Sequence, residues 1–120
     1  DLNLLDTIID SPDRDLIVAR IDGKLVGSAV MNLILFTSGR KAWLEDFVVS
    51  SDMNIRGSGV GYALWQEIVA WAKEREAPLE FTSASSRERA HLFYHRQGAS
   101  IKPTSVFRYV IVQNSFYTRQ

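Results

Sequence analysis

Residues 42–64 read AWLEDFVVSSDMNIRGSGVGYAL and contain the transition that decides the fold. Residues 42–49 are rich in apolar, branched and aromatic side chains and predict a β-strand that carries the acidic pair Glu45–Asp46. From Val60 onward, the apolar residues recur at the spacing of an amphipathic helix. Between them lies the glycine-rich segment 56–61, RGSGVG. The stretch therefore predicts a strand, a glycine-rich turn and a helix in direct succession.

The glycine-rich segment has the composition of an anion-binding turn. Glycine removes side chains from the turn, so that consecutive backbone N–H groups can converge on an anion at the helix start, where the helix dipole also favours negative charge. Two common phosphate loops do not fit: a dinucleotide fingerprint needs glycine or alanine where Tyr62 stands, and a triphosphate loop needs a lysine followed by serine or threonine. The segment predicts a phosphate-bearing ligand, with a tight turn that merely caps the helix as the alternative.

Upstream of this stretch, the sequence predicts a short helix and an antiparallel sheet. Residues 2–9 have the apolar spacing of a helix. The β-branched run from residue 16 to 21 and the run from residue 24 to 36 flank the turn dipeptide Asp22-Gly23, a pattern typical of a β-hairpin. A second turn over residues 37–40 leads into the acidic strand. These strands come first, and the helices that follow make the domain α+β.

Downstream, the helix that begins after the glycines is expected to run until Ala77-Pro78. The further elements expected are, in order, a strand over Leu79–Thr82, a helix from about Ser86 to Gln97 and a strand over Val106–Val112. Gly98 is a natural residue for the C-terminal cap of the helix that is expected to end at Gln97.

Composition limits the classes of function. The chain has 120 residues, 14 Lys and Arg against 14 Asp and Glu, no cysteine and 46% hydrophobic residues, which is typical of one globular domain. The lack of cysteine excludes disulfide scaffolds and thiol chemistry. A net charge of zero argues against a nucleic-acid partner, and no apolar run is long enough for a membrane span. We expect a cytoplasmic protein, with N-terminal residues missing because the chain begins at Asp1.

Two motifs in this order resemble those of the GNAT superfamily of acetyl-CoA-dependent N-acetyltransferases. The phosphate motif of that family is Arg or Gln, two residues, Gly, one residue, and Gly or Ala, and it is matched by Arg56, Gly59 and Gly61. The later signature of the family is matched by Ala90, Phe93, Tyr94 and Gly98. The resemblance covers roughly Leu16 to Ile111 and implies one GNAT-like domain over residues 1–120. The strand and helix with which the family usually begins are not found ahead of Leu2.

The resemblance also implies an architecture and a co-substrate. The fold would be a mixed, mostly antiparallel central sheet with helices on both faces, and acetyl-CoA would be the co-substrate. Its pyrophosphate would bind the segment Arg56, Gly57, Ser58, Gly59, Val60 and Gly61. The backbone of Phe47, Val48 and Val49 would bind the acetyl carbonyl and pantetheine, while their side chains belong to the core. Phe93 would pack against the sheet or the pantetheine arm, and Arg87, where the family commonly has Asn, would contact a phosphate.

Glu45, Asp46 and Tyr94 are the candidate catalytic residues. An alkylamine with a pKa of about 10.4 is protonated at neutral pH, so it must lose a proton before it attacks a thioester. Glu45 or Asp46 could accept that proton, and on a regular strand only one of these neighbours faces the cleft. The resemblance favours Glu45, with Asp46 kept as the alternative. The Tyr94 phenol could assist departure of the thiolate. A solvated acid and a packed tyrosine are the structural alternatives. His91 and His95 lack further ligands at metal-site spacing, so no metal site is predicted.

Together these features predict an N-acetyltransferase that moves an acetyl group from acetyl-CoA directly to a primary amine of a small molecule. The alternative is a non-catalytic acyl-CoA-binding or sensor module with the same fold. We expect no metal, no nucleic-acid partner and no membrane association, and we leave a homodimer open.

Overall fold

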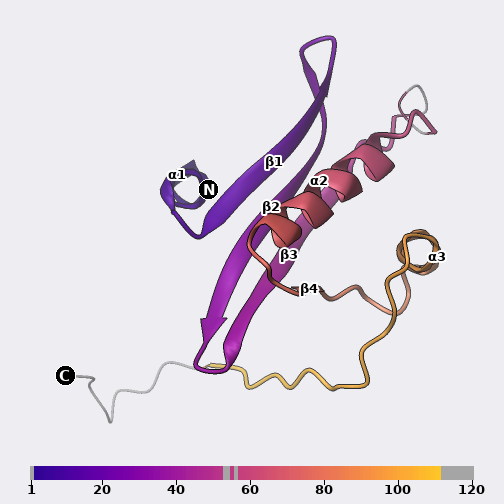
Figure 1. Cartoon of the computed structure of the whole chain (residues 1–120). Coiled ribbons are helices and arrows are strands. Elements are labelled where there is room, and N and C mark those ends of the chain that lie inside the picture. Colours follow the sequence, from indigo (N-terminus) through magenta and orange to yellow (C-terminus); the bar gives the residue numbers. More distant parts are fainter. Residues whose placement is uncertain (1, 53–54, 56, 112–120) are drawn as a thin grey trace. The chain divides into compact units, whose positions relative to one another are not determined.

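The computed structural model describes residues 2–52, 55 and 57–111, and Figure 1 shows the path of the chain. Contacts divide the chain into two compact units, Asp1–Thr82 and Ser83–Gln120. Among the described residues, the first unit contains the sheet and two helices, and the second contains one helix.

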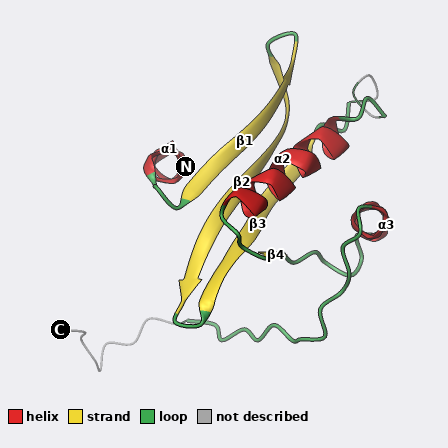
Figure 2. Cartoon of the chain, in the orientation of Figure 1, coloured by secondary structure: helices red, strands yellow, loops and turns green. Residues whose placement is uncertain are grey.

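The first unit is a four-stranded sheet with helices, coloured by secondary structure in Figure 2. Its elements are α1 (Leu2–Asp10), β1 (Arg14–Ile21), β2 (Lys24–Phe36), β3 (Gly39–Val49), α2 (Val60–Glu74) and β4 (Leu79–Glu80). The strand order is β1-β2-β3-β4, with β1, β2 and β3 antiparallel and β4 parallel to β3. The predicted hairpin and the α+β class, with a mixed and mostly antiparallel sheet, are confirmed.

A β-bulge interrupts the pairing of β2 with β3. Val30 lies opposite Glu45 but Ser28 lies opposite Val48, so the single residue Ala29 faces two residues of β3. One of those two, Asp46, has a left-handed backbone with φ 50°. An extra residue shifts the two-residue alternation of side chains by one position. The bulge was not predicted, because Asp46 is not a glycine.

Helix α2 packs on the sheet through the predicted apolar stripe. Its buried residues are Val60, Leu64, Trp65, Ile68, Trp71 and Ala72. Val60 and Leu64 join Val26 of β2 in one core cluster, and Phe47 and Val49 pack against it. Because of the bulge, Phe47 and Val49 face the same side of the sheet as the buried Leu44. The bulge therefore turns Phe47 and Val49 toward the start of α2.

Helix α2 ends at Glu74, three residues before the expected end at Ala77. The N–H of Glu76 donates to the Lys73 carbonyl (3.0 Å), and the N–H of Ala77 donates to the Ala72 carbonyl (3.0 Å). With Glu76 left-handed at φ 51°, this is a Schellman termination. The residues before Pro78 thus cap the helix rather than extend it.

The second unit contains α3 (Glu88–Arg96), which begins two residues later and ends one residue earlier than predicted. Gly98 has φ 94°, and the N–H of Ala99 donates to the Tyr94 carbonyl at 3.0 Å. The predicted role of Gly98 at the helix end is confirmed, because this hydrogen-bond pattern needs a left-handed residue there.

The predicted final strand over Val106–Val112 is wrong for the residues that the structure describes. Residues 106–111 have no regular secondary structure, and Phe107 is 94% exposed; Val112 lies outside the described part. β4 is also shorter than the predicted Leu79–Thr82. A β-branched composition favours a strand only where a partner strand supplies backbone hydrogen bonds and packing.

Candidate functional site

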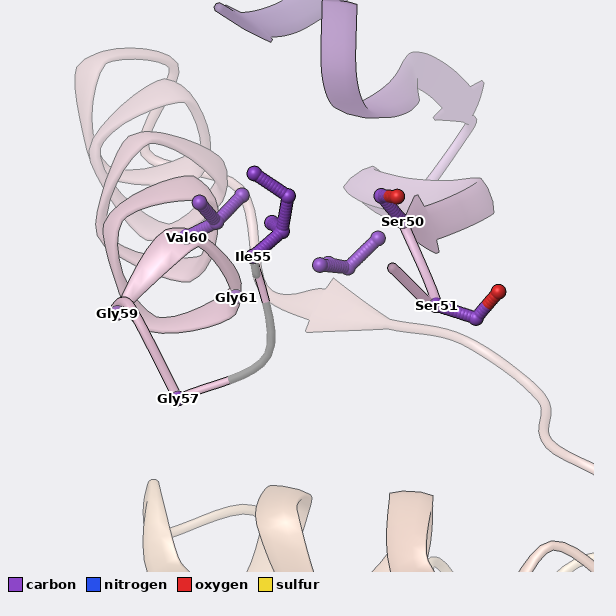
Figure 3. Close-up of a pocket in the computed structure, with 8 residues that line it drawn as sticks. Ser50, Ser51, Ile55, Gly57, Gly59, Val60 and Gly61 are labelled. Carbon is purple, nitrogen blue, oxygen red and sulfur yellow. The ribbon is translucent and has the colours of Figure 1, made fainter. Parts of the chain in front are cut away.

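The main candidate site is a cavity of about 260 Å³ between the end of β3 and the start of α2. It is lined by Val49, Ser50, Ser51, Ile55, Gly57, Gly59, Val60 and Gly61, all of the first unit, and Figure 3 shows these residues around it. The structure thus brings the glycine-rich segment beside the last residue of β3. Arg56, predicted to bind the pyrophosphate, lies outside the described residues.

Backbone conformation explains two of the three glycines that line this cavity. Gly57 and Gly59 have φ angles of 82° and 87°, which side chains other than glycine rarely adopt. A Cβ atom at either position would meet no heavy atom within 4 Å. Glycine therefore permits the turn and also leaves the backbone open to a ligand.

The electrostatics of the cavity favour an anion. Gly59 is the N-cap of α2, and its carbonyl accepts the first helical hydrogen bond, from the N–H of Ala63 (2.9 Å). The N–H groups of Val60, Gly61 and Tyr62 precede that donor and have no acceptor within the helix. Among the residues that the structure describes, no side chain caps this helix start. With the partial positive charge of the helix dipole, these groups suit a phosphate. Ser58 lies in the same turn, with its N–H donating to the Ile55 carbonyl (3.0 Å).

β3 runs on beyond the short strand β4. The two strands pair at Ala42 with Leu79 and at Trp43 with Glu80, whereas residues 44–49 continue toward the cavity. The expectation that the side chains of residues 47–49 all belong to the core is wrong for Val48, which is 57% exposed. After the bulge, Val48 points away from α2, since its pairing partner Ser28 lies on that face of β2.

Glu45 and Asp46 are both exposed. The Trp43 indole Nε1–H donates to Glu45 Oε1 at 2.6 Å. Glu45 lies opposite Val30, on the face of the sheet away from α2. Asp46 lies at the bulge, so the rule that adjacent strand residues point to opposite faces does not apply to this pair. The Trp43–Glu45 hydrogen bond was not predicted; their spacing of two residues along one strand was the only signal.

Tyr94, Phe93 and Arg87 lie together in the second unit. The Phe93 and Tyr94 rings contact edge to face, with centroids 5.8 Å apart. Burial raises the pKa of the Tyr94 phenol above its ordinary value of 10.0, and the Arg87 guanidinium partly offsets this rise. Tyr94 therefore stays protonated at neutral pH and can donate a hydrogen bond. Arg87 is also the N-cap of α3, although its side chain makes no capping hydrogen bond.

The two histidines of α3 differ in their surroundings. His91 Nε2 is buried and has no hydrogen-bond partner within the described part of the chain, while His95 Nδ1 lies 3.2 Å from the Ala99 carbonyl oxygen. Within the described ranges, no three His, Asp or Glu side chains are grouped so as to hold a metal ion.

The model of the acetyltransferase (GNAT) family matches residues 2–99 of the chain. The protein belongs to the GNAT acetyltransferase family. The match includes α1 and the end of α3, and family membership makes acyl transfer the chemistry of this fold. No curated protein matches the chain.

Solved structures with this GNAT fold are similar to the chain at low sequence identity. A transcriptional regulator from Bacillus halodurans C-125 has a TM-score of 0.79 and 24% identity, covering 91% of this chain and 74% of its own. An aminoglycoside acetyltransferase from an uncultured soil metagenomic sample, in complex with trehalose, has a TM-score of 0.80 and 17% identity, covering 94% and 75%. A ribosomal-protein-alanine N-acetyltransferase from Brucella melitensis biovar Abortus 2308 has a TM-score of 0.72 and 22% identity, covering 91% and 79%. These likenesses support the GNAT fold.

No helix among the described residues of this GNAT protein has the length and apolar character to cross a membrane.

Proposed function

We propose that this GNAT protein transfers an acetyl group from acetyl-CoA directly to the primary amine of a small molecule. The observation that carries the proposal is the cavity at the start of α2, where two left-handed glycines leave uncapped N–H groups open to an anion. A coenzyme pyrophosphate is an anion of the kind that such a helix start binds. Gly57, Ser58, Gly59, Val60 and Gly61 would hold it.

The end of β3 would bind the acyl-bearing arm of the coenzyme. Val49 lines the cavity, and the strand runs on beyond its pairing with β4 at Ala42 and Trp43. Backbone groups of residues 47–49 are therefore the proposed partners of the pantetheine and the acetyl carbonyl. Bound acetyl-CoA would supply an activated thioester.

Residues of this chain would handle two proton transfers. Glu45 or Asp46 would accept a proton from the attacking amine, because an alkylammonium with a pKa of about 10.4 has no free electron pair. As the C–N bond forms and the C–S bond breaks, the departing thiolate would be stabilised by the Tyr94 hydroxyl. A thiol has a pKa of about 8.5, and that of Tyr94 is raised above 10.0. Because the phenol is the weaker acid, Tyr94 is better suited to donate a hydrogen bond to the thiolate than to transfer its proton completely. The role rests on this chemistry and on the motif around Tyr94.

An amine screen tests the proposal. The full chain is incubated with acetyl-CoA and a library of primary amines, and the release of free coenzyme thiol is followed against a control without amine. We expect release that depends on one class of amine, and acetyl-CoA alone should raise the melting temperature. A stabilised protein that acetylates no amine would instead be an acyl-CoA-binding module. A protein that shows neither effect would contradict the proposal.

A further inference from the structure

Two tryptophan–carboxylate pairs of the first unit have the same hydrogen-bond length but different settings. Trp71 Nε1–H donates to Asp15 Oδ2 at 2.6 Å, and Trp43 Nε1–H donates to Glu45 Oε1 at 2.6 Å. The first pair joins α2 to β1, and Arg75 of the turn after α2 adds an ion pair to Asp15 at 3.3 Å. That pair has an evident structural role, because it holds a helix on a sheet.

The second pair joins residues two positions apart on one strand. Trp43 and Glu45 both belong to β3, so their hydrogen bond connects no two elements of the fold. An exposed carboxylate has water as an alternative partner, so the net contribution of such a bond to stability is small. Its direct physical effect is to restrict the rotamers of a long, flexible side chain. The bond thus orients the Glu45 carboxylate and contributes little to the stability of the fold.

Trp43 is well placed to hold that orientation. It is the last residue of β3 that pairs with β4, opposite Glu80, and its carbonyl accepts a hydrogen bond from Asn32 Nδ2 at 3.2 Å. Neighbouring strands therefore hold its backbone on both sides. Glu45 follows two residues later, where β3 continues beyond β4 and just before the bulge at Asp46. The indole of Trp43 thus extends from a held backbone and lies beside an exposed acid, in the part of β3 that leads to the cavity.

We propose that Trp43 is a positioning residue for the Glu45 carboxylate, and that this makes Glu45, rather than Asp46, the group that accepts the amine proton. The inference rests on the proposed function. The indole N–H can only donate, so it occupies Oε1 of the carboxylate and leaves Oε2 to accept a proton from the amine. A proton acceptor held in one orientation needs no reordering when the amine arrives, which is how positioning contributes to rate.

A double-mutant cycle tests this inference. Trp43→Phe keeps an aromatic ring and removes the N–H donor, and it is compared with Glu45→Gln and with the double variant. We expect Trp43→Phe to lower kcat on the order of 10-fold, with the KM for acetyl-CoA nearly unchanged. In the Glu45→Gln background, the same substitution should cause no further loss, because the carboxylate that Trp43 orients is already gone.

Trp71→Phe is the matched control. It removes an indole donor from a carboxylate at the same distance, but from the pair that joins α2 to β1. This variant should lower the melting temperature and leave kcat close to wild type at temperatures where it is folded. If Trp43→Phe lowers kcat equally in both backgrounds, or only lowers stability as Trp71→Phe does, Trp43 is a packing residue and the inference is wrong. Wild-type kcat in Glu45→Gln or in Trp43→Phe would also overturn it.

A spectroscopic measurement separates this inference from the proposed function. The indole N–H resonances of ¹⁵N-labelled protein are assigned by single Trp→Phe variants, and that of Trp43 is followed in Glu45→Gln. We expect an upfield shift, because an amide oxygen is a weaker acceptor than a carboxylate. An unchanged resonance would show that the hydrogen bond is absent in solution. If the Trp43 resonance shifts but the protein acetylates no amine, the hydrogen bond exists and the proposed function is wrong. The catalytic role of the Trp43–Glu45 hydrogen bond would then be wrong as well.

Discussion

Gly27 of β2 lies directly against Leu64 of α2. A Cβ atom added to Gly27 would come only 2.7 Å from Leu64 Cδ1. The same atom would lie 3.1 Å from the Val48 carbonyl oxygen and 3.3 Å from Val60 Cγ1. Val60 is the first residue of α2 and lines the cavity. The absence of a side chain at Gly27 therefore sets how closely the helix start approaches the sheet.

Gly27→Ala should destabilise the protein by about 1–3 kcal/mol, as overpacking of a core does. The cost arises because Leu64 is 2% exposed and has little room to move. Urea unfolding measures the loss, with Ser28→Ala on the opposite face of β2 as the control. Adding Leu64→Val should recover part of the stability. An unchanged unfolding midpoint in Gly27→Ala would show that the helix moves away at no cost.

Gly59→Val should abolish the stabilisation of the protein by acetyl-CoA. A branched side chain at the N-cap would occupy the open space in front of the N–H groups of α2, and the pyrophosphate could not approach. Gly23→Val is the matched control. Gly23 has φ 78°, and a Cβ atom there would meet no heavy atom within 4 Å, but this residue lies in the β1–β2 turn. Both variants carry similar backbone strain. The melting-temperature shift with acetyl-CoA should persist in Gly23→Val, and its persistence in folded Gly59→Val would exclude this turn as the phosphate site.

Replacement of the acidic pair by amides should lower turnover most at neutral pH. Glu45→Gln is expected to lose roughly 100-fold in kcat/KM near pH 7, within the range for loss of a general base. Activity should partly recover at alkaline pH, where more of the amine is already deprotonated. Asp46→Asn is expected to have the smaller effect. Equal activity of both single variants and the double variant across pH would eliminate proton acceptance by this pair.

Tyr94→Phe should lower the chemical step by about 10- to 1,000-fold while acetyl-CoA affinity stays nearly constant. The substitution removes only the hydroxyl and keeps the ring that contacts Phe93. Single-turnover measurements separate chemistry from product release. A wild-type rate would make Tyr94 a packing residue, and loss of acetyl-CoA binding would make it a wall of the coenzyme site.

The same variant tests the surroundings of Tyr94 through the pH dependence of stability. Burial raises the pKa of this phenol in the folded protein above 10.0, so folding favours its protonated form. Its contribution to stability is fully present below pH 10 and is lost as pH rises through the folded-state pKa. Relative to Tyr94→Phe, the wild type should therefore lose stability as the pH rises above about 10. Parallel stability curves for the two proteins would contradict the burial of this hydroxyl.

The sequence by itself determined the features that depend on local backbone chemistry. The turn at Asp22-Gly23, the glycine-rich turn before α2 and the place of Gly98 at the end of α3 were all predicted. Each needs a conformation that few residues other than glycine adopt, so one residue type suffices to locate it. The apolar stripe of α2 was likewise predicted, because its period follows from helix geometry alone.

Only the tertiary structure decided the features that depend on pairing between distant segments. The bulge at Asp46, the exposure of Val48, the shortness of β4 and the absence of a strand over residues 106–111 are of this kind. A strand exists only where another strand satisfies its backbone, and the face that a side chain takes depends on register rather than on residue type. For the same reason, the residues alone did not distinguish Glu45 from Asp46, and only the family resemblance favoured Glu45. The bulge and the indole of Trp43 distinguish them in the folded chain.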